Sequence, residues 1–293
     1  MLSGFYSELM YKRAPFRFPR RGKDLEKKIL NGDILMKIRN LFSKTIQMNG
    51  IIKFPNSDTS SPSPGGVRGG SLTKLIKQGE HQTQDFKYCI SDSRKIARSL
   101  VAFANTDGGR LLVGVKDNGR IAGVRSEEEY YMVESAAKMY SKPAIEFTTR
   151  QHFVEGKTVL EVIVEPSSEK PHFARDDEGK WWAYFRKDDE NRLANKIMIE
   201  VWKLQKSPDG ILINYSDAEK CLLDYLENNE KISVSKYARI AHLTYKKAEQ
   251  TIINFRTLNI LKDCVGDNRI DYSINLEFDR EEWENKSDSK NYF

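Results

Sequence analysis

The sequence has few cysteines and no long apolar run. Its three cysteines, Cys89, Cys221 and Cys264, are widely spaced along 293 residues, so they can form neither a disulfide framework nor a paired zinc motif. No window approaches the roughly 20 apolar residues that a membrane-spanning helix requires, and the first residues lack the pattern of a secretory signal. We therefore expect a cytoplasmic protein with no membrane partner.

An excess of basic residues is confined to the start of the chain. The formal net charge is +6, from 48 Lys and Arg against 42 Asp and Glu, and residues 1–50 contain 11 basic and 4 acidic residues. Residues 80–293 contain 33 basic and 37 acidic residues. A basic charge favours nucleic-acid partners, but in this chain the charge describes the first segment rather than the rest of the protein.

Composition divides the chain into four segments. Residues 1–70 combine basic clusters with a Ser/Pro/Gly-rich linker and predict a largely disordered arm. Residues 71–206 interleave helical and strand patterns, which predicts an α+β domain. Residues 211–276 predict three helices followed by a β-hairpin, the order of a winged helix-turn-helix domain, and residues 277–293 form a polar tail.

Apolar periodicity and turn residues place the elements of the α+β domain. We expect a tight hairpin turn at Asp117-Asn-Gly119. The expected helices cover 72–79, 93–104, 127–140 and 193–204, and the expected strands cover 83–88, 110–115, 144–153, 158–165 and the aromatic stretch 181–186.

A Gly-Gly pair connects one predicted helix directly to the next strand. Gly108 and Gly109 suit the positive φ that such an abrupt change requires, and Asn105 can cap the turn. A phosphate cradle at the glycine amides is the alternative. No Walker A or Rossmann repeat accompanies the pair, so no motif supports an ATP site.

Three motifs follow one another in the α+β domain: Glu80-His-Gln-Thr-Gln-Asp-Phe-Lys87, Ala102-Phe-Ala-Asn-Thr-Asp-Gly-Gly109 and Leu111-Leu-Val-Gly-Val-Lys-Asp-Asn-Gly119. Over about residues 72–205 the chain thereby resembles the Schlafen AlbA-type domain family, which implies a mixed-sheet α+β fold. Bacterial relatives often carry a winged helix behind this domain, as expected here. The resemblance implies nucleic-acid handling, since many of these relatives are described as DNA-binding regulators and some, by older analogy, as ATP-binding proteins.

The resemblance also implies a set of acidic site residues. In animal Schlafen ribonucleases three acidic residues form a metal-dependent site that cuts structured RNA such as tRNA. The matching residues are Glu80, Asp85 and Asp117, as catalytic residues and as ligands of Mg²⁺ or Mn²⁺. Asp85 replaces a longer Glu of the family pattern. The animal enzymes pair two such lobes, so a homodimer would have to rebuild the second lobe here.

Each carboxylate also has an ordinary interpretation. Converging oxygen ligands suit Mg²⁺ or Mn²⁺, and such an ion could activate water and stabilise phosphoryl charge. However, Asp117 before Asn-Gly is a common turn residue. Glu80 could be a solvated loop acid, and Asp85 could pair with Lys87 or Arg110.

Two groups of residues are candidates for contacting nucleic acid. Basic residues that flank the motif strands could neutralise phosphates: Lys87, Arg110, Lys116 and Arg120. Arg186, which ends the aromatic strand, is a further candidate for contact with nucleic acid. A solvated, salt-bridged face is the alternative. Residues that open the third predicted helix of the winged helix could contact base edges, with a wing residue on a phosphate: Thr244, Tyr245, Lys246, Lys247, Gln250 and Arg269.

We therefore predict a nucleic-acid-binding protein, with DNA or RNA as the partner. A DNA-binding transcriptional regulator is the first hypothesis. A divalent-metal-dependent endoribonuclease is the second, and an ATP-binding or protein-interaction module is the third, because winged helices also bind proteins.

Overall fold

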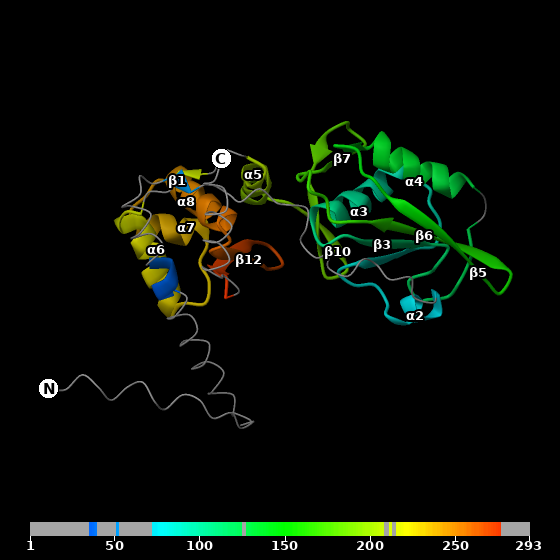
Figure 1. The fold of residues 1–293 in the computed structure, drawn as a ribbon, viewed down its shortest axis with the longest axis horizontal. Coiled ribbons are helices and arrows are strands. Elements are labelled where there is room, and N and C mark those ends of the chain that lie inside the picture. Colours follow the sequence, from blue (N-terminus) through cyan, green and yellow to red (C-terminus); the bar gives the residue numbers. More distant parts are fainter. Residues whose placement is uncertain are drawn as a thin grey trace, which may run out of the picture.

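The computed structural model describes residues 35–39, 51–52, 72–124, 127–207, 211–212 and 215–276 (Figure 1). The predictions for the polar tail and for most of the basic arm lie outside the described residues. The described elements form an N-terminal unit, from α2 to β10, and a C-terminal unit, from α5 to β13. Among the helices described, none combines the length and the apolar character that crossing a bilayer requires.

A four-stranded mixed sheet forms the centre of the N-terminal unit. Its strand order is β2 (Gln84–Lys87), β3 (Gly109–Val113), β6 (Lys157–Val164) and β5 (Thr148–Val154). β2 and β3 run parallel, whereas the other two pairs are antiparallel. Parallel neighbours need a crossover connection, and helix α3 (Ser93–Asn105) provides it. The predicted α+β class with a mixed sheet is confirmed.

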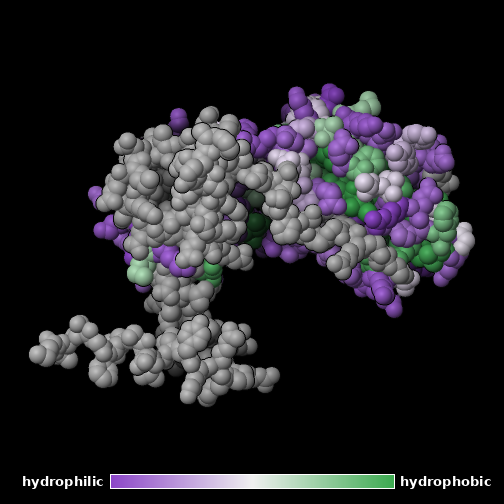
Figure 2. All heavy atoms as spheres, in the orientation of Figure 1, coloured by the Kyte–Doolittle hydropathy of each residue, from purple (hydrophilic) through white to green (hydrophobic). Residues whose placement is uncertain are grey.

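Helices cover both faces of this sheet (Figure 1). Helices α3 and α4 (Glu128–Lys138) pack on one face, and the short helix α2 (Leu72–Lys77) packs on the other. Successive strand residues point to opposite faces, so Phe86 is buried under α2 while Asp85 points to the α3 side. Figure 2 shows hydrophilic residues along the rim of this unit and hydrophobic residues near the middle of its visible face.

Two smaller sheets complete the N-terminal unit. One contains β4 (Ser141–Lys142), β7 (Phe173–Arg175) and β8 (Trp181–Trp182), and the other is the hairpin of β9 (Tyr184–Lys187) and β10 (Glu190–Leu193). The single aromatic strand expected over 181–186 is therefore divided between two sheets.

Helix α5 (Lys196–Gln205) begins later than the sequence predicts. The expected helix starts at Leu193, but this residue pairs with Tyr184 in the β9–β10 hairpin. Asn195 then caps α5, because its Oδ1 accepts the Met198 N–H at 2.8 Å.

The C-terminal unit has three helices followed by an antiparallel strand pair. The helices are α6 (Asp217–Asn228), α7 (Val234–Ile240) and α8 (Tyr245–Thr257), and the strands are β12 (Leu261–Val265) and β13 (Ile270–Ile274). Each helix begins at a hydroxyl side chain that accepts a backbone N–H of the first turn; these residues are Ser216, Ser233 and Thr244.

Residues from outside the predicted winged-helix segment also enter this core. Ile197 and Val201 of α5 are buried against the C-terminal helices, although the predicted boundary after residue 206 assigns α5 to the first domain. The helical residues 35–39 contribute Leu35 and Ile38 to the same core. Strand β1 (Ile51–Ile52) pairs with β11 (Ile211–Leu212).

Candidate functional site

Two of the three predicted carboxylates lie together beside β2. The Oε1 atom of Glu80 accepts the Phe86 N–H at 2.8 Å, and the Glu80 carboxyl also hydrogen-bonds Asp85. Burial, together with the neighbouring Asp85, raises the pKa of Glu80. A proton taken up by this pair therefore goes to Glu80 rather than to Asp85.

Asp85 is buried and carries the negative charge of the pair. Lys87 Nζ lies 2.7 Å from its Oδ2, and Arg186 Nη2 lies 3.5 Å from its Oδ1. The Ser99 hydroxyl donates to Oδ2 at 3.3 Å. Burial by itself would raise the pKa of Asp85, but the hydrogen bond from Glu80 and the charges of Lys87 and Arg186 outweigh it and lower that pKa.

The position of Arg186 corrects one prediction. We expected contact with nucleic acid, but only 1 % of its side chain is exposed. Its Nη1 donates to Asn191 Oδ1 at 2.9 Å and its Nη2 donates to the Gln84 carbonyl at 3.2 Å, while the guanidinium lies over the Phe103 ring. Arg186 therefore joins β9 to β2 and α3 and offers no donor to a ligand in solvent.

Asp117 does not join the other two carboxylates. It is exposed in the turn that the Gly119 N–H closes on the Lys116 carbonyl at 2.8 Å. Within the described ranges, no three His, Cys, Asp or Glu side chains lie together as a metal site requires. Asp85 is already neutralised by cationic side chains, so these residues do not fit Mg²⁺ or Mn²⁺ held by three carboxylates. The metal site stays a prediction without geometric support.

The other basic residues of the N-terminal unit differ in exposure. Lys116 and Arg120 are exposed at the two sides of the Asp117 turn, and Lys116 Nζ lies 5.1 Å from the centroid of the Tyr88 ring. Lys87 is partly exposed but pairs with Asp85. Of the phosphate contacts predicted in this unit, Lys116 and Arg120 are therefore the two that can meet a phosphate without breaking an ion pair.

A buried carboxylate that none of the sequence motifs indicates lies on the α2 side of the sheet. Glu161 on β6 is fully buried; its Oε2 lies 2.8 Å from His152 Nε2 and its Oε1 lies 3.4 Å from Arg110 Nη1. Arg110, which we predicted to contact phosphate, thus faces an internal partner. The signal in the sequence is the single acid in the apolar run Val159-Leu-Glu-Val-Ile-Val164.

Asn105 and the Gly-Gly pair form a closely packed turn. The Asn105 amide donates to the carbonyls of His172 and Tyr184 at 2.9 and 2.8 Å, and its Oδ1 accepts the His172 N–H at 2.8 Å. Gly108 has φ +73°, and a Cβ there would lie 2.7 Å from Pro166 Cδ. A Cβ on Gly109 would lie 2.5 Å from the Phe103 ring. At both glycines this packing leaves no room for a Cβ.

The first turn of α8 is exposed. Thr244 Oγ1 accepts the Lys247 N–H at 3.3 Å. Tyr245, Lys246 and Lys247 face solvent, as does Gln250 one turn later, whereas Ala248 and Ile252 are buried. Thr244 is exposed as well, so all five predicted helix contacts of the C-terminal unit lie at the surface. Arg269 lies at the β12–β13 connection, 71 % exposed, with its Nε 3.1 Å from Asp271 Oδ2.

Comparison with known proteins finds a family resemblance within the N-terminal unit. Residues 80–195 match the family model described as Schlafen, AlbA_2, which confirms the resemblance found in the motifs. No curated protein matches the chain.

Solved structures with matching segments have low sequence identity. The DIP2311 protein from Corynebacterium diphtheriae is 19 % identical, with a TM-score of 0.33, over 59 % of this chain and 29 % of that one. This chain therefore spans less than a third of the DIP2311 protein. The N-terminal domain of a Nitrosomonas europaea protein, described as related to the ATP-dependent DNA helicase RecG, is 23 % identical, with a TM-score of 0.33, over 44 % of this chain and 97 % of that domain.

Proposed function

We propose that this chain, whose residues 80–195 resemble the Schlafen AlbA-type domain family, is a nucleic-acid-binding protein that acts as a DNA-binding transcriptional regulator. The observation that carries the proposal is the exposed first turn of α8, which presents two lysines, a tyrosine and a glutamine on a packed helical unit.

The order of elements in the C-terminal unit supports a winged helix. Helices α7 and α8 are joined by a short turn, in which the Leu243 N–H bonds the Ala238 carbonyl at 2.9 Å. The β12–β13 pair follows α8 at once, as a wing follows a recognition helix. In helix-turn-helix proteins the second helix contacts base edges with its N-terminal residues, and these are the exposed residues of α8.

The charges on this surface favour DNA. Neither Lys246 nor Lys247 makes an ion pair with another described residue, so their ammonium groups are available for phosphates. Gln250 can donate and accept on an adenine edge. Arg269 on the wing can reach a phosphate if it releases Asp271.

Fluorescence anisotropy with labelled random-sequence duplex DNA tests this proposal. We expect the Lys246→Ala/Lys247→Ala variant to bind at least about tenfold more weakly than wild type. The matched control is Lys203→Ala/Lys220→Ala, which removes the same charge from exposed positions on α5 and α6. Unchanged affinity in the first variant, or an equal loss in the control, would reject α8 as the DNA-contacting helix.

The same preparation tests the endoribonuclease hypothesis. Labelled tRNA is incubated with the full chain in Mn²⁺ and in EDTA, beside an Asp85→Asn variant. The geometry of Glu80, Asp85 and Asp117 predicts no cleavage. Cleavage that needs Mn²⁺ and disappears in the variant would overturn the regulator assignment in favour of the nuclease.

A further inference from the structure

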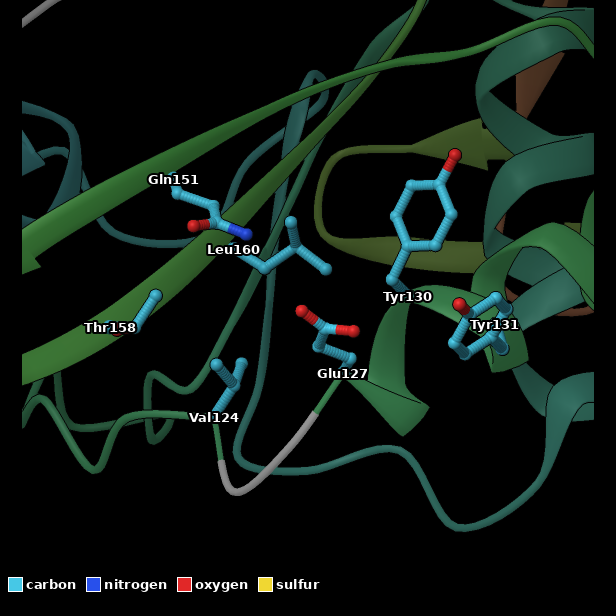
Figure 3. Close-up of a pocket in the computed structure, with 7 residues that line it drawn as sticks. All are labelled: Val124, Glu127, Tyr130, Tyr131, Gln151, Thr158 and Leu160. Carbon is cyan, nitrogen blue, oxygen red and sulfur yellow. The ribbon is translucent and has the colours of Figure 1, made fainter.

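An open groove lies between the start of α4 and the β5–β6 strand pair, on the α4 side of the main sheet (Figure 3). Its volume is about 450 Å³. Glu127, Tyr130 and Tyr131 form the helix wall, and Gln151 and Thr158 form the strand wall. None of these five residues belongs to the acidic pair beside β2 or to the first turn of α8.

Polar groups in this groove lack internal partners. The carboxylate of Glu127 points into the space between the helix and the strands, and the amide of Gln151 points toward the same space (Figure 3). Within the described part of the chain, neither the Glu127 carboxylate nor the Gln151 amide has a hydrogen-bond partner, and Glu127 forms no ion pair. Convergent polar groups beside apolar walls are what ligand sites present.

Two aromatic rings stand beside the carboxylate. Tyr130 and Tyr131 pack edge to face with centroids 5.8 Å apart, and Tyr130 also contacts Phe147. Tyr131 nevertheless has 61 % of its surface exposed. An exposed tyrosine ring attracts a cation over its face and packs against flat groups.

The charge of the groove decides between ligand classes. No Lys or Arg is among the described residues that line it, and Glu127 gives it an acidic group. A nucleotide would bring phosphates toward this carboxylate, and none of the described lining residues is a cation that would offset the repulsion. A guanidinium instead suits both walls, because it is cationic, donates two parallel hydrogen bonds to one carboxylate and stacks on aromatic faces.

Strand β5 offers a free edge along which a bound peptide would place such a side chain at the groove. β5 is the last strand in the order of the main sheet, so its outer edge has no strand partner within the described residues. Gln151 of β5 lines the groove, and Phe153, two residues further on, is 76 % exposed on the same face. An extended peptide that adds to this edge projects alternate side chains toward the groove.

We propose that the groove at Glu127, Tyr131 and Gln151 binds an arginine side chain of an extended basic peptide that lies along β5. This site is separate from the DNA surface proposed on α8, so either proposal can fail without the other. The guanidinium pairs with Glu127 and stacks against the tyrosine wall.

Isothermal titration with the full chain tests the proposal. The probe is the peptide acetyl-Thr-Arg-Val-Arg-Thr-amide, and its control contains citrulline in place of both arginines, which keeps the shape and removes the charge. We expect the citrulline peptide to bind at least tenfold more weakly. The amide NMR chemical shifts of Gln151 and Thr158 should change when the arginine peptide binds.

Three variants locate the interaction. Glu127→Gln should weaken binding of the arginine peptide at least tenfold, and Tyr131→Leu should weaken it roughly two- to fivefold. Both residues are exposed, so neither change removes core packing. Glu134→Gln is the matched control, since Glu134 lies on the same helix but pairs with Lys138 at 2.7 Å, and it should leave affinity unchanged.

Several results would overturn the proposal. These are equal affinity for the two peptides, no binding at millimolar concentration, or equal losses in Glu127→Gln and Glu134→Gln. Guanosine is titrated as a further arm. Guanosine binding that exceeds peptide binding and requires Glu127 would replace the peptide with a nucleobase as the occupant.

Discussion

Arg186 Nη2 lies 3.5 Å from Asp85 Oδ1, and only 1 % and 5 % of these side chains are exposed. Removing one member of a buried ion pair leaves a charge without its partner. We expect Arg186→Met to lower the free energy of unfolding by about 3 kcal/mol, measured by urea denaturation. Arg94→Met removes an exposed arginine that pairs with Asp92 at 3.2 Å, and it should cause a much smaller change. Equal changes in the two variants would show that burial of Arg186 does not matter.

Gly108 and Gly79 form a matched pair for separating backbone strain from steric clash. Both have positive φ, +73° and +71°, but a Cβ on Gly79 would meet nothing within 4 Å, whereas a Cβ on Gly108 would lie 2.7 Å from Pro166 Cδ. We expect Gly79→Ala to cost about 1–2 kcal/mol. Gly108→Ala should cost at least about 1 kcal/mol more. Equal unfolding energies would contradict the packing of this turn.

Asn105 makes three buried hydrogen bonds that tie the end of α3 to two other segments. Asn105→Ala leaves the groups on His172 and Tyr184 without partners, so we expect a loss of at least about 2 kcal/mol in unfolding free energy. Asn229→Ala is the control, because the Asn229 amide donates to the Tyr225 carbonyl at an exposed helix end. A loss in Asn105→Ala no larger than in the control would reject this role.

His172 predicts how stability changes with pH. Its Nδ1 lies 3.0 Å from the Pro143 carbonyl, which can only accept, so Nδ1 carries the hydrogen and Nε2 accepts from Ser167 at 2.7 Å. Burial lowers the pKa of His172. Below about pH 6.5, the ordinary pKa of histidine, the imidazole is protonated in the unfolded chain, whereas in the folded chain it stays neutral until the pH is lower. The free energy of unfolding therefore falls as the pH falls.

Urea denaturation between pH 7.5 and 5.5 measures this effect. We expect His172→Gln to lose part of the wild-type dependence of the unfolding free energy on pH. His81, whose pKa is also lowered by burial, should maintain the rest of that dependence. The full wild-type dependence in His172→Gln would refute the role of the buried imidazole.

Salt dependence gives a separate measure of the lysines on α8. Each phosphate that a protein neutralises contributes a slope of about −0.9 to the logarithm of the binding constant against the logarithm of salt concentration. If Lys246 and Lys247 each contact one phosphate, the double alanine variant should have a slope smaller in magnitude by about 2. A slope equal to that of wild type would place both lysines off the DNA.

Local sequence signals predicted the helices better than the short strands. Helix α3 was expected over 93–104 and spans Ser93–Asn105, because its apolar period and its glycine stop are strong. Strand β10 was missed since the turn before it uses Asp188 at φ +56° rather than a glycine. Without a glycine signal, the polar stretch Glu190–Leu193 has no feature typical of a hairpin.

In the candidate site, contacts between residues close in sequence were predictable, whereas contacts between distant residues were not. Glu80 and Asp85 are five residues apart, so a turn into one strand suffices to bring them together. The burial of Arg186 depends on Asp85 and Gln84, which lie about a hundred residues away in sequence. Likewise, Glu161 gains its partners only when β3 and β5 align beside β6. Such pairings depend on register, which no local pattern in the sequence determines.

The hydrogen bond from the Phe86 N–H to Glu80 makes the two edge strands of the main sheet, β2 and β5, unequal. A strand arriving at β2 would have to displace a carboxylate that already satisfies an outward-facing amide, whereas β5 presents no such obstacle in the part of the chain that the structure describes. Growth of the sheet by strand addition is therefore directed to one side. Because an unpaired strand edge is a template for pairing with another chain, this side-chain bond makes β2 a poorer template than β5.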